Sequence, residues 1–324
     1  MSKLLEVKDL KMYIKVRRGV VKAVDGISFS VDAGEAFGIV GESGCGKTMT
    51  SLSLLKLQPH PAGQIIGGEI ILDGEDLVQK NEAEMRKVRG RKLSMILQDP
   101  LTSLNPAYSI GNQVAEAVII HQHLKGKPLW EKVIQALRLV KIPAAERRLR
   151  DFPHQMSGGM RQRVTGAIAL STEPLLLIAD EPTTSLDVTI QAQYMELLKE
   201  IQVKSKVGMI FITHDFGIIA EMCENVAVMY AGRIVEKAST RDLFNNPLHP
   251  YTKALIGCLP KLEARWQKLD TIPGQPPDLS KLPVGCRFAD RCPEVMDVCT
   301  QGYPEETVVE GNHNVSCWLQ EKQS

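Results

Sequence analysis

The chain has 324 residues, 44% of them hydrophobic, which is enough for one large domain and an appendage. Its 39 Lys and Arg nearly balance 38 Asp and Glu, so no broad basic surface for nucleic acid or acidic lipid is expected. No stretch approaches the roughly 18 consecutive apolar residues of a membrane helix, and Met1 to Leu10 lacks a signal-peptide core. We therefore expect a soluble, cytosolic protein of two unequal domains.

The first part of the chain predicts β-structure followed by a phosphate-binding loop. Leu4 to Leu10 alternates in polarity, and Gly26 to Val31 is rich in β-branched and aromatic residues. Ala36 to Val40 is a short buried-type strand, after which a Gly-rich turn leads into a helical pattern from Lys47 towards Leu57. Strand, loop and helix follow in the order that a phosphate-binding loop requires.

The turn itself matches G-x-x-x-x-G-K-[ST]. In this pattern the backbone N–H groups wrap the phosphates of ATP, Lys47 reaches the β and γ oxygens, and Thr48 ligates Mg²⁺. The alternative, a glycine turn that merely links strand and helix, is disfavoured by the Lys-Thr pair and the flanking elements. The predicted nucleotide-binding residues here are Gly41, Ser43, Gly44, Cys45, Gly46, Lys47, Thr48 and Met49.

The middle of the chain predicts helices. From Ile110 to about Leu149 apolar residues recur at spacings of three and four, and we expect an all-helical insert. Ser157 to Arg163 then predicts a new helix, with Ser157 as N-cap and two glycines leaving free N–H groups at its positive end. An ordinary capped helix is the alternative to an anion site. The apolar residues of the insert are Val114, Val118, Ile119, Val133, Leu137 and Val140.

Two further buried strands of parallel type predict an α/β core. They are Leu175 to Ala179 and Met209 to Thr213, separated by a predicted helix from Val188 to Val203. The first strand ends in two carboxylates: Asp180 is predicted to hold Mg²⁺, and Glu181 to lie beside the attacking water. A solvated strand end is the alternative for such a pair of acids.

After Asn245 the composition shifts towards proline, and we place a domain boundary near Phe244. Four cysteines in this last part are separated by five, six and seventeen residues, which differs from the C-x₂-C spacing of most structural zinc sites. Four thiolates suit zinc or an iron–sulfur cluster, and four buried or free thiols are the alternative. They are Cys286, Cys292, Cys299 and Cys317.

Ser157 to Arg163 resembles the signature sequence of ABC ATPases, and the order of motifs matches that family over the first 240 or so residues. The resemblance implies a head-to-tail dimer in which ATP lies between one subunit's phosphate loop and Ser157, Gly158 and Gly159 of the other subunit. It also implies that Glu181 and a histidine place the water in line with the γ-phosphate, while Lys47 and Mg²⁺ neutralise the developing charge.

The family match assigns further roles. Gln98 resembles the glutamine that senses Mg²⁺ and the water, in a segment that contacts the membrane subunit. His214 resembles the switch histidine, and Ser185-Leu186-Asp187 the loop that communicates across the dimer, with a serine in place of the commoner alanine. Tyr13 and Ile14 compete for the place of the aromatic that stacks on adenine, and Tyr13 is preferred. Buried structural roles for Gln98 and His214 and a surface role for Tyr13 are the alternatives.

The tail resembles one branch of the family. Pro247 to Leu255 contains His-Pro-Tyr, which is similar to the element opening the C-terminal region of oligopeptide, dipeptide and nickel importer ATPases. Ile272-Pro273-Gly274, Gly285 to Phe288 and Arg291-Cys292-Pro293 extend the resemblance almost to the end. It favours a structural [4Fe–4S] cluster on the four cysteines, and a heterodimer with a second ABC ATPase over a homodimer.

The predicted fold is a P-loop NTPase core of ABC type with an N-terminal antiparallel β-subdomain, a helical subdomain and a small Cys-rich C-terminal domain. The nucleotide-binding domain is expected over residues 1–244, with the helical part at about 100–172, and the C-terminal domain over 245–324. The predicted function is the ATP-hydrolysing motor of a bacterial dipeptide or oligopeptide importer.

This motor would use ATP and Mg²⁺ and lie peripherally at the cytoplasmic face of the inner membrane. It would work with two permease subunits and, indirectly, with an extracytoplasmic binding protein. Nickel or an oligosaccharide is the alternative transported substrate. The alternative class of protein is a soluble ABC ATPase that acts on nucleic acid or ribosomes. That class is disfavoured because the chain has neither a second nucleotide domain nor a long basic coiled coil.

Overall fold

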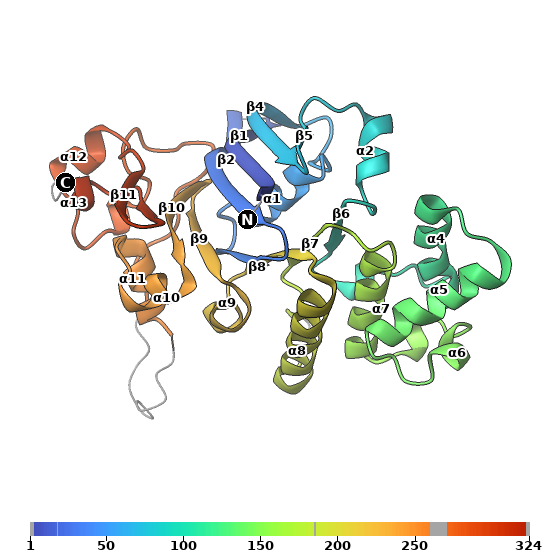
Figure 1. Ribbon diagram of the computed structural model, residues 1–324. Helices are drawn as coiled ribbons and strands as arrows, with labels where there is room; N and C mark the ends of the chain where they lie inside the picture. Colours follow the sequence, from blue (N-terminus) through green and yellow to red (C-terminus); the bar gives the residue numbers. More distant parts are fainter. Residues whose placement is uncertain (1–2, 18, 185, 260–270, 322–324) are drawn as a thin grey trace. The chain divides into compact units, whose positions relative to one another are not determined.

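The computed structural model describes residues 3–17, 19–184, 186–259 and 271–321 (Figure 1). Its contacts divide the chain into two compact units, each assembled from separate segments. The first unit contains Met1–Leu4, Val31–Ala36 and Gln79–Phe211, and the second contains Leu5–Ser30, Phe37–Val78 and Ile212–Ser324. Most of the two N-terminal strands and the described part of the C-terminal region therefore belong to the same unit.

The second unit holds a four-stranded sheet in the order β2-β1-β4-β5. β1 pairs antiparallel with β4, with Leu5 opposite Leu72, and β4 pairs antiparallel with β5. The alternation seen in Leu4 to Leu10 buries Leu5 and Val7, as one face of a strand requires. Both predicted strands are longer than the sequence pattern indicated. Their bounds are β1 Lys3–Val16, β2 Gly19–Asp32, β4 Gly63–Leu72 and β5 Glu75–Asp76.

A second set of strands in this unit runs in the order β11-β12-β10-β9-β3. β3 pairs parallel with β9, and the other pairs are antiparallel. β3 has the bounds expected from the sequence, and all five of its residues are buried. The C-terminal strand β12 pairs with β10, so residues after Asn245 continue this sheet. The strands are β3 Ala36–Val40, β9 Asn225–Tyr230, β10 Arg233–Ser239, β11 Thr307–Glu310 and β12 His313–Val315.

The helices of the second unit are short. α1 begins at Lys47 as predicted but ends at Leu54, three residues before the expected Leu57. The boundary placed near Phe244 falls within α10, inside this unit, and so differs from the division made by contacts. That domain boundary stays a prediction. The helices are α1 Lys47–Leu54, α9 Phe216–Met222, α10 Thr240–Asn245, α11 Pro250–Gly257, α12 Asp297–Gln301 and α13 Trp318–Glu321, with a 3₁₀ turn η2 at Ala289–Arg291.

The first unit contains three neighbouring strands in the order β8-β7-β6. β6 and β7 are parallel, with Leu93 opposite Leu176, and every residue of β7 is buried. The α/β pattern predicted for this part of the chain is thus present, with β7 shifted by one residue from the expected run. The elements are α2 Glu82–Val88, β6 Leu93–Ile96, β7 Leu176–Asp180, α8 Val188–Ser205 and β8 Gly208–Thr213, the last of which ends in the second unit.

Helices make up the elements between β6 and β7, drawn in green in Figure 1. α4, α5 and α7 pack against one another and bury Val118 and Val133. Ile119, which we had grouped with the apolar face, is 42% exposed because one step along a helix turns a side chain about 100° away. The elements are α3 Pro100–Ser103, α4 Ile110–Gln122, α5 Gly126–Leu139, α6 Ala145–Arg148, η1 Pro153–Gln155 and α7 Gly158–Leu170.

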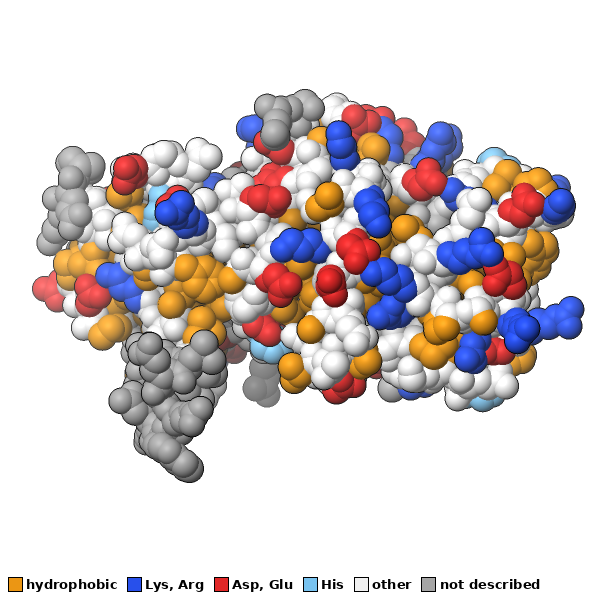
Figure 2. Space-filling view, turned by 60° about the horizontal axis from the view of Figure 1, so that its bottom comes forward, with side chains coloured by type: hydrophobic (Ala, Val, Ile, Leu, Met, Phe, Trp, Pro, Cys, Tyr) orange, Lys and Arg blue, Asp and Glu red, His pale blue; other side chains and the backbone are white. Residues whose placement is uncertain are grey.

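The surface agrees with the balanced charge of the chain. On the face shown in Figure 2, Lys and Arg side chains are interspersed with Asp and Glu, and no single sign covers a large area of that face. Among the residues that the structure describes, none of the helices combines the length and apolar character needed to cross a membrane.

Candidate nucleotide-binding site

The predicted phosphate loop connects β3 to α1, the arrangement that its motif requires. Gly41 has a φ of +153°, and a Cβ there would lie 2.1 Å from the carbonyl oxygen of Met229. Gly46 has a φ of +108°, and its Cβ would lie 2.1 Å from the carbonyl oxygen of Ala23. Only glycine fits at these two positions, because any side chain would overlap backbone.

Within the loop, Ser43, Gly44 and Thr48 are exposed, whereas Cys45 and Lys47 are buried. The Lys47 ammonium donates hydrogen bonds to the carbonyl oxygens of Gly41, at 2.7 Å, and Glu42, at 3.0 Å. Burial raises the pKa of the Cys45 thiol, so this side chain stays neutral and packs inward. Met49 follows in the first turn of α1 and is half-buried.

Gln98 and Glu181, which are 83 positions apart in sequence, lie in direct contact. β6 and β7 are parallel neighbours with Ile96 opposite Ala179, so the residues two positions beyond each partner leave the sheet at the same edge. Gln98 Nε2 donates to Glu181 Oε2 at 2.7 Å, and Thr184 Oγ1 lies 3.0 Å from the same oxygen. The structure therefore brings together two of the predicted catalytic residues.

The two carboxylates after β7 differ in environment. Asp180 is the last residue of the strand and is 1% exposed, whereas Glu181 is half-buried. Glu181 also has a φ of +44°, in the left-handed region that non-glycine residues seldom occupy. Such backbone strain is concentrated at functional sites, where the surrounding contacts hold it in place.

The signature segment begins α7 as predicted. Ser157 is its N-cap and accepts a hydrogen bond from the Met160 N–H at 3.3 Å. Gly158 has open space around it, but a Cβ on Gly159 would lie 2.5 Å from Cγ2 of Ile190 on α8. Asp187 caps α8 by accepting from the Ile190 N–H.

The first turns of α7 and α8 are therefore in contact, which places Gly159 beside the helix that Asp187 begins. The neighbouring Ser185 lies outside the described residues.

His214 and Tyr13 lie in the second unit. His214 follows β8 and is exposed, directly before Asp215, which caps α9. Tyr13 is half-buried on β1, and its hydroxyl donates to the carboxylate of Asp25. Burial and this hydrogen bond raise the pKa of Tyr13 to about 12. The roles of both residues towards ATP stay predictions.

The four cysteines of the tail line one pocket. The Cys286 N–H donates to the Cys299 carbonyl at 2.7 Å, and Gly285 must be glycine because a Cβ would lie 2.1 Å from that oxygen. Burial, with a smaller effect from the neighbouring thiols, raises the pKa of Cys286 to about 11 and of Cys317 to about 12.

As these side chains are placed, no group of three or more His, Cys, Asp or Glu within the described part of the chain is arranged to hold a metal ion. The [4Fe–4S] cluster and the Mg²⁺ ligand set of Thr48, Gln98 and Asp180 therefore remain predictions.

Sequence reasoning missed a group of residues that hold the loop and Tyr13 in place. The His249-Pro250-Tyr251 element begins α11: His249 Nδ1 accepts from the Tyr251 N–H, and the Tyr251 hydroxyl accepts from the Glu42 N–H at 2.9 Å. Arg291 pairs with the Glu42 carboxylate, and Arg287 pairs with Asp25. His249, Tyr251, Arg287 and Arg291 all lie in segments that resemble the family, but nothing in those segments indicated contacts with Glu42 or Asp25.

Comparison with known proteins agrees with this geometry. The model for the ABC transporter family matches residues 24–184, and that for the oligopeptide/dipeptide transporter C-terminal region matches residues 235–299. The dipeptide transport ATP-binding protein DppD of Bacillus subtilis (strain 168) is 48% identical over 324 residues, covering 100% of this chain and 97% of that protein. The oligopeptide transport ATP-binding protein OppD of the same strain is 47% identical, covering 98% and 89%.

Among solved structures, the dimeric post-hydrolysis ATP-binding cassette MJ0796 with ADP and Pi superimposes with a TM-score of 0.66 at 23% identity, covering 73% of this chain and 99% of that one. The class of protein is thus an ATP-binding cassette, in which mixed α/β sheets carry the phosphate loop. The chain belongs to the ABC transporter ATPases, in the branch that carries the oligopeptide/dipeptide transporter C-terminal region.

Proposed function

We propose that this ABC ATPase powers the import of dipeptides or oligopeptides through separate membrane subunits. The observation that carries the proposal is full-length similarity to relatives named for dipeptide and oligopeptide transport, at 47–48% identity. The match extends through the C-terminal region, beyond the cassette that transporters of other cargo also share. A transport assay could instead show that nickel or an oligosaccharide is imported.

We assign roles to the site residues from their chemistry. Lys47 and the loop N–H groups bind the phosphates of ATP, and the positive charge of Lys47 offsets charge that develops on the γ-phosphate. Thr48, Asp180 and Gln98 supply oxygen ligands for Mg²⁺, a donor type that this ion prefers. Tyr13 offers its ring to adenine.

Hydrolysis needs a group that orients water, and Glu181 is our candidate. Its carboxylate accepts from Gln98 and Thr184, so two donors fix its orientation before water arrives. His214, at the end of β8, donates to the γ-phosphate in this proposal.

We propose that the working form is a head-to-tail dimer. Ser157, Gly158 and Gly159 would contact the ATP held by the other subunit, because the start of α7 presents free N–H groups and the positive end of a helix. The open space around Gly158 leaves room for a phosphate to approach the backbone. A second, non-identical ABC ATPase is the expected partner, and Asp187 would communicate between the subunits.

A groove in the first unit is our candidate for contact with the permease. It is lined by Leu97, Ala117, Ile120 and Ile168, among others, and adjoins Gln98 in sequence. Leu97 is 47% and Ile120 56% exposed, which is unusual for large apolar side chains that share one pocket. Binding a permease helix here would bury them and place the subunit peripherally at the cytoplasmic face of the membrane.

The docking proposal can be tested by copurification with the two permease subunits. Leu97→Asp and Ile120→Asp should each reduce the permease recovered, without changing ATP affinity. Val203→Asp is a matched control, since Val203 is 67% exposed on α8 and lies outside the groove. Full recovery with both groove variants would exclude this surface.

The transport function is tested with the purified complex in proteoliposomes that enclose ATP. We expect ATP hydrolysis to rise when the binding protein loaded with a dipeptide or oligopeptide is added outside, and labelled peptide to accumulate inside. If only nickel or only an oligosaccharide stimulates ATP hydrolysis, that compound and not a peptide is the transported substrate. Copurification with ribosomes or DNA in place of permeases would refute import altogether.

We also propose that residues 245–324 form a Cys-rich domain in which Cys286, Cys292, Cys299 and Cys317 bind a [4Fe–4S] cluster. Support comes from the convergence of the four thiols on one pocket and from the preference of iron–sulfur clusters for thiolate ligands. The cluster would supply cross-links to a region with a small core. Four iron atoms per chain after anaerobic purification would support it, whereas one zinc and no colour would refute it.

A further inference from the structure

Glu42, at the second position of the phosphate loop, is held at three points. Its N–H donates to the Tyr251 hydroxyl at 2.9 Å, and its carbonyl accepts from the Lys47 ammonium at 3.0 Å. Its carboxylate receives two parallel hydrogen bonds from Arg291, of 2.7 and 2.9 Å. A residue fixed at its donor, its acceptor and its side chain has little freedom, and the loop that follows it shares that restriction.

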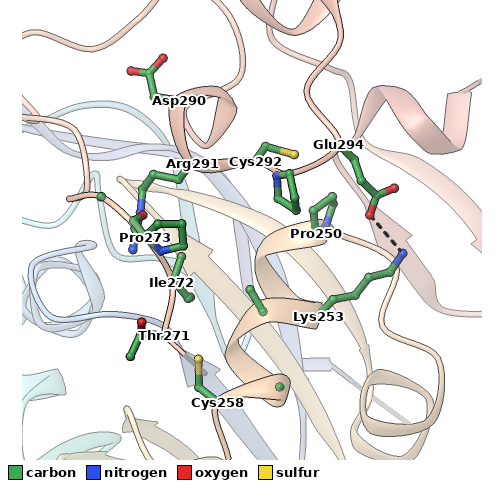
Figure 3. A pocket seen from close by; sticks show the side chains of 14 residues that line it. Pro250, Lys253, Cys258, Thr271, Ile272, Pro273, Asp290, Arg291, Cys292 and Glu294 are labelled. Atoms are coloured by element: carbon green, nitrogen blue, oxygen red, sulfur yellow. Dashed lines mark hydrogen bonds and ion pairs between the residues drawn. The ribbon is translucent and has the colours of Figure 1, made fainter. Parts of the chain in front are cut away.

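Arg291 is itself firmly placed. Its side chain is 4% exposed, and beyond the pair with Glu42 it donates to the Pro273 carbonyl at 2.9 Å and to the Tyr230 hydroxyl at 3.2 Å. Figure 3 shows Arg291 next to Pro273, in the wall of a pocket that Lys253 and Glu294 also line. Two-point binding of a carboxylate by a buried guanidinium fixes direction as well as distance.

Four residues earlier, Arg287 makes an analogous contact with the strand pair that carries Tyr13. Its guanidinium is 6% exposed and hydrogen-bonds to the Asp25 carboxylate and the Ala231 carbonyl. Asp25 in turn accepts from the Tyr13 hydroxyl. One short segment of the C-terminal region thus reaches both the loop predicted to bind phosphate and the ring predicted to stack on adenine.

We propose that Arg287 and Arg291 are positioning residues for nucleotide: Arg291 holds Glu42, Arg287 holds Asp25, and together they set the affinity of the phosphate loop and Tyr13 for ATP. The inference rests on the proposed nucleotide roles of Lys47 and Tyr13. Its physical basis is preorganisation, because a loop already fixed by protein contacts loses less conformational entropy when a ligand binds. Neither arginine needs to touch ATP.

The test measures the dissociation constant of a fluorescent ATP analogue and the steady-state kcat and KM for ATP, on the full-length chain. Arg291→Met and Glu42→Gln should each weaken binding by roughly ten- to a hundredfold, because the loop must then be ordered by the ligand. KM should rise by a similar factor, with kcat within twofold. Arg291→Lys, which keeps the charge but loses the two-point fork, should lie between wild type and Arg291→Met.

The coupling between Arg291 and Glu42 is tested with a double variant. If Arg291 acts through Glu42, Arg291→Met/Glu42→Gln should bind no more weakly than either single variant. Lys253→Met is the control: it removes the ion pair of Lys253 with Glu294 on the same pocket wall, 4.0 Å long and half exposed, and should leave nucleotide affinity unchanged. Thermal unfolding shows whether each variant is folded. If Arg291→Met does not fold, Glu42→Gln alone tests the contact.

Two results distinguish a failure of the positioning role from a failure of the proposed nucleotide site. If Lys47→Ala abolishes nucleotide binding while folded Glu42→Gln and Arg291→Lys bind as wild type, the positioning role is refuted and the phosphate loop stands. If Lys47→Ala binds nucleotide as wild type does, the assignment of this loop as the phosphate-binding loop is refuted. Fully additive losses in the double variant would also overturn the coupling between Arg291 and Glu42.

Discussion

Glu181 and Glu42 both follow buried strands, yet their carboxylates are held in different ways. Glu181 is fixed by Gln98 and Thr184, which come from the neighbouring strand end and from its own turn. Glu42 is fixed by Tyr251 and Arg291, which lie 209 and 249 positions further along the chain. The position of the Glu181 carboxylate thus depends on the pairing of two neighbouring strands, and that of the Glu42 carboxylate on contacts with the C-terminal region.

This difference separates two functions that a nucleotide site must combine. In the proposed site the contacts around Glu181 orient the group that places water, so their loss should lower the rate of hydrolysis. The contacts around Glu42 fix the loop that we propose binds phosphate, so their loss should lower the affinity for ATP. The C-terminal region that marks the peptide transporter branch therefore supplies contacts that hold the loop predicted to bind phosphate.

The largest expected effect is on Glu181. Glu181→Gln keeps the size of the side chain but removes the charge that orients water, and should lower kcat by about a hundred- to a thousandfold while ATP still binds. Lys47→Ala should weaken both binding and hydrolysis. Both are measured by phosphate release and nucleotide titration. Near-normal turnover of Glu181→Gln would remove Glu181 from this role.

The second prediction tests the C-terminal contacts through pH. Burial lowers the pKa of His249 to about 4, from the usual 6.5, although Glu236 raises it and Lys253 lowers it further. Between pH 6.5 and 4 the unfolded chain therefore takes up a proton that the folded chain does not, and stability is lost as pH falls. The expected loss is about 2 kcal/mol between pH 8 and pH 5.

Urea unfolding of His249→Asn at both pH values checks this prediction. Asn can still cap α11, so the variant should fold while losing that part of the pH dependence. His154→Asn, at an exposed position, should behave as wild type. Identical pH dependence in all three proteins would contradict a buried neutral His249.

The third prediction concerns the contact between the first turns of α7 and α8. Gly159→Ala places a methyl group 2.5 Å from Ile190 and should destabilise the fold by about 2 kcal/mol. Gly158→Ala meets nothing within 4 Å and should not destabilise it. Ile190→Ala should restore part of the loss in Gly159→Ala, as measured by thermal unfolding. Equal effects of the two glycine substitutions would refute this packing.

The smallest expected effect concerns the orientation of Glu181. Gln98→Ala removes the 2.7 Å hydrogen bond and should lower kcat about tenfold at saturating Mg²⁺, with little change in nucleotide affinity. Thr184→Val, which removes the longer contact, should have a weaker effect. If the loss in Gln98→Ala disappears at high Mg²⁺ concentration, Gln98 acts only through the metal and does not orient Glu181.

The sequence predicted those features that depend on neighbouring residues. The bounds of β3, the start of α1 and the N-cap Ser157 follow from local patterns, and the structure agrees. The strand before Asp180 and Glu181 was predicted because it is a buried apolar run, whereas the strand Leu93–Ile96 before Gln98 was not predicted.

The arginine contacts could not be predicted in this way. Arg291 is followed directly by Cys292, and in sequence its nearest notable neighbours are cysteines, whereas its partner Glu42 lies in a loop at the other end of the chain. No local pattern encodes a pairing over 249 positions. The same holds for Tyr251, which a family motif identified but whose contact with the Glu42 N–H only the fold reveals.

We propose that Glu42 and its C-terminal partners set the affinity for ATP, whereas Glu181 and its neighbours set the rate of hydrolysis. The most direct test measures the ATP dissociation constant and the single-turnover rate constant on four variants: Glu42→Gln, Arg291→Met, Glu181→Gln and Gln98→Ala. We predict that the first two change the dissociation constant and the last two the rate constant. If all four variants change the same quantity, the two carboxylates do not have separate functions.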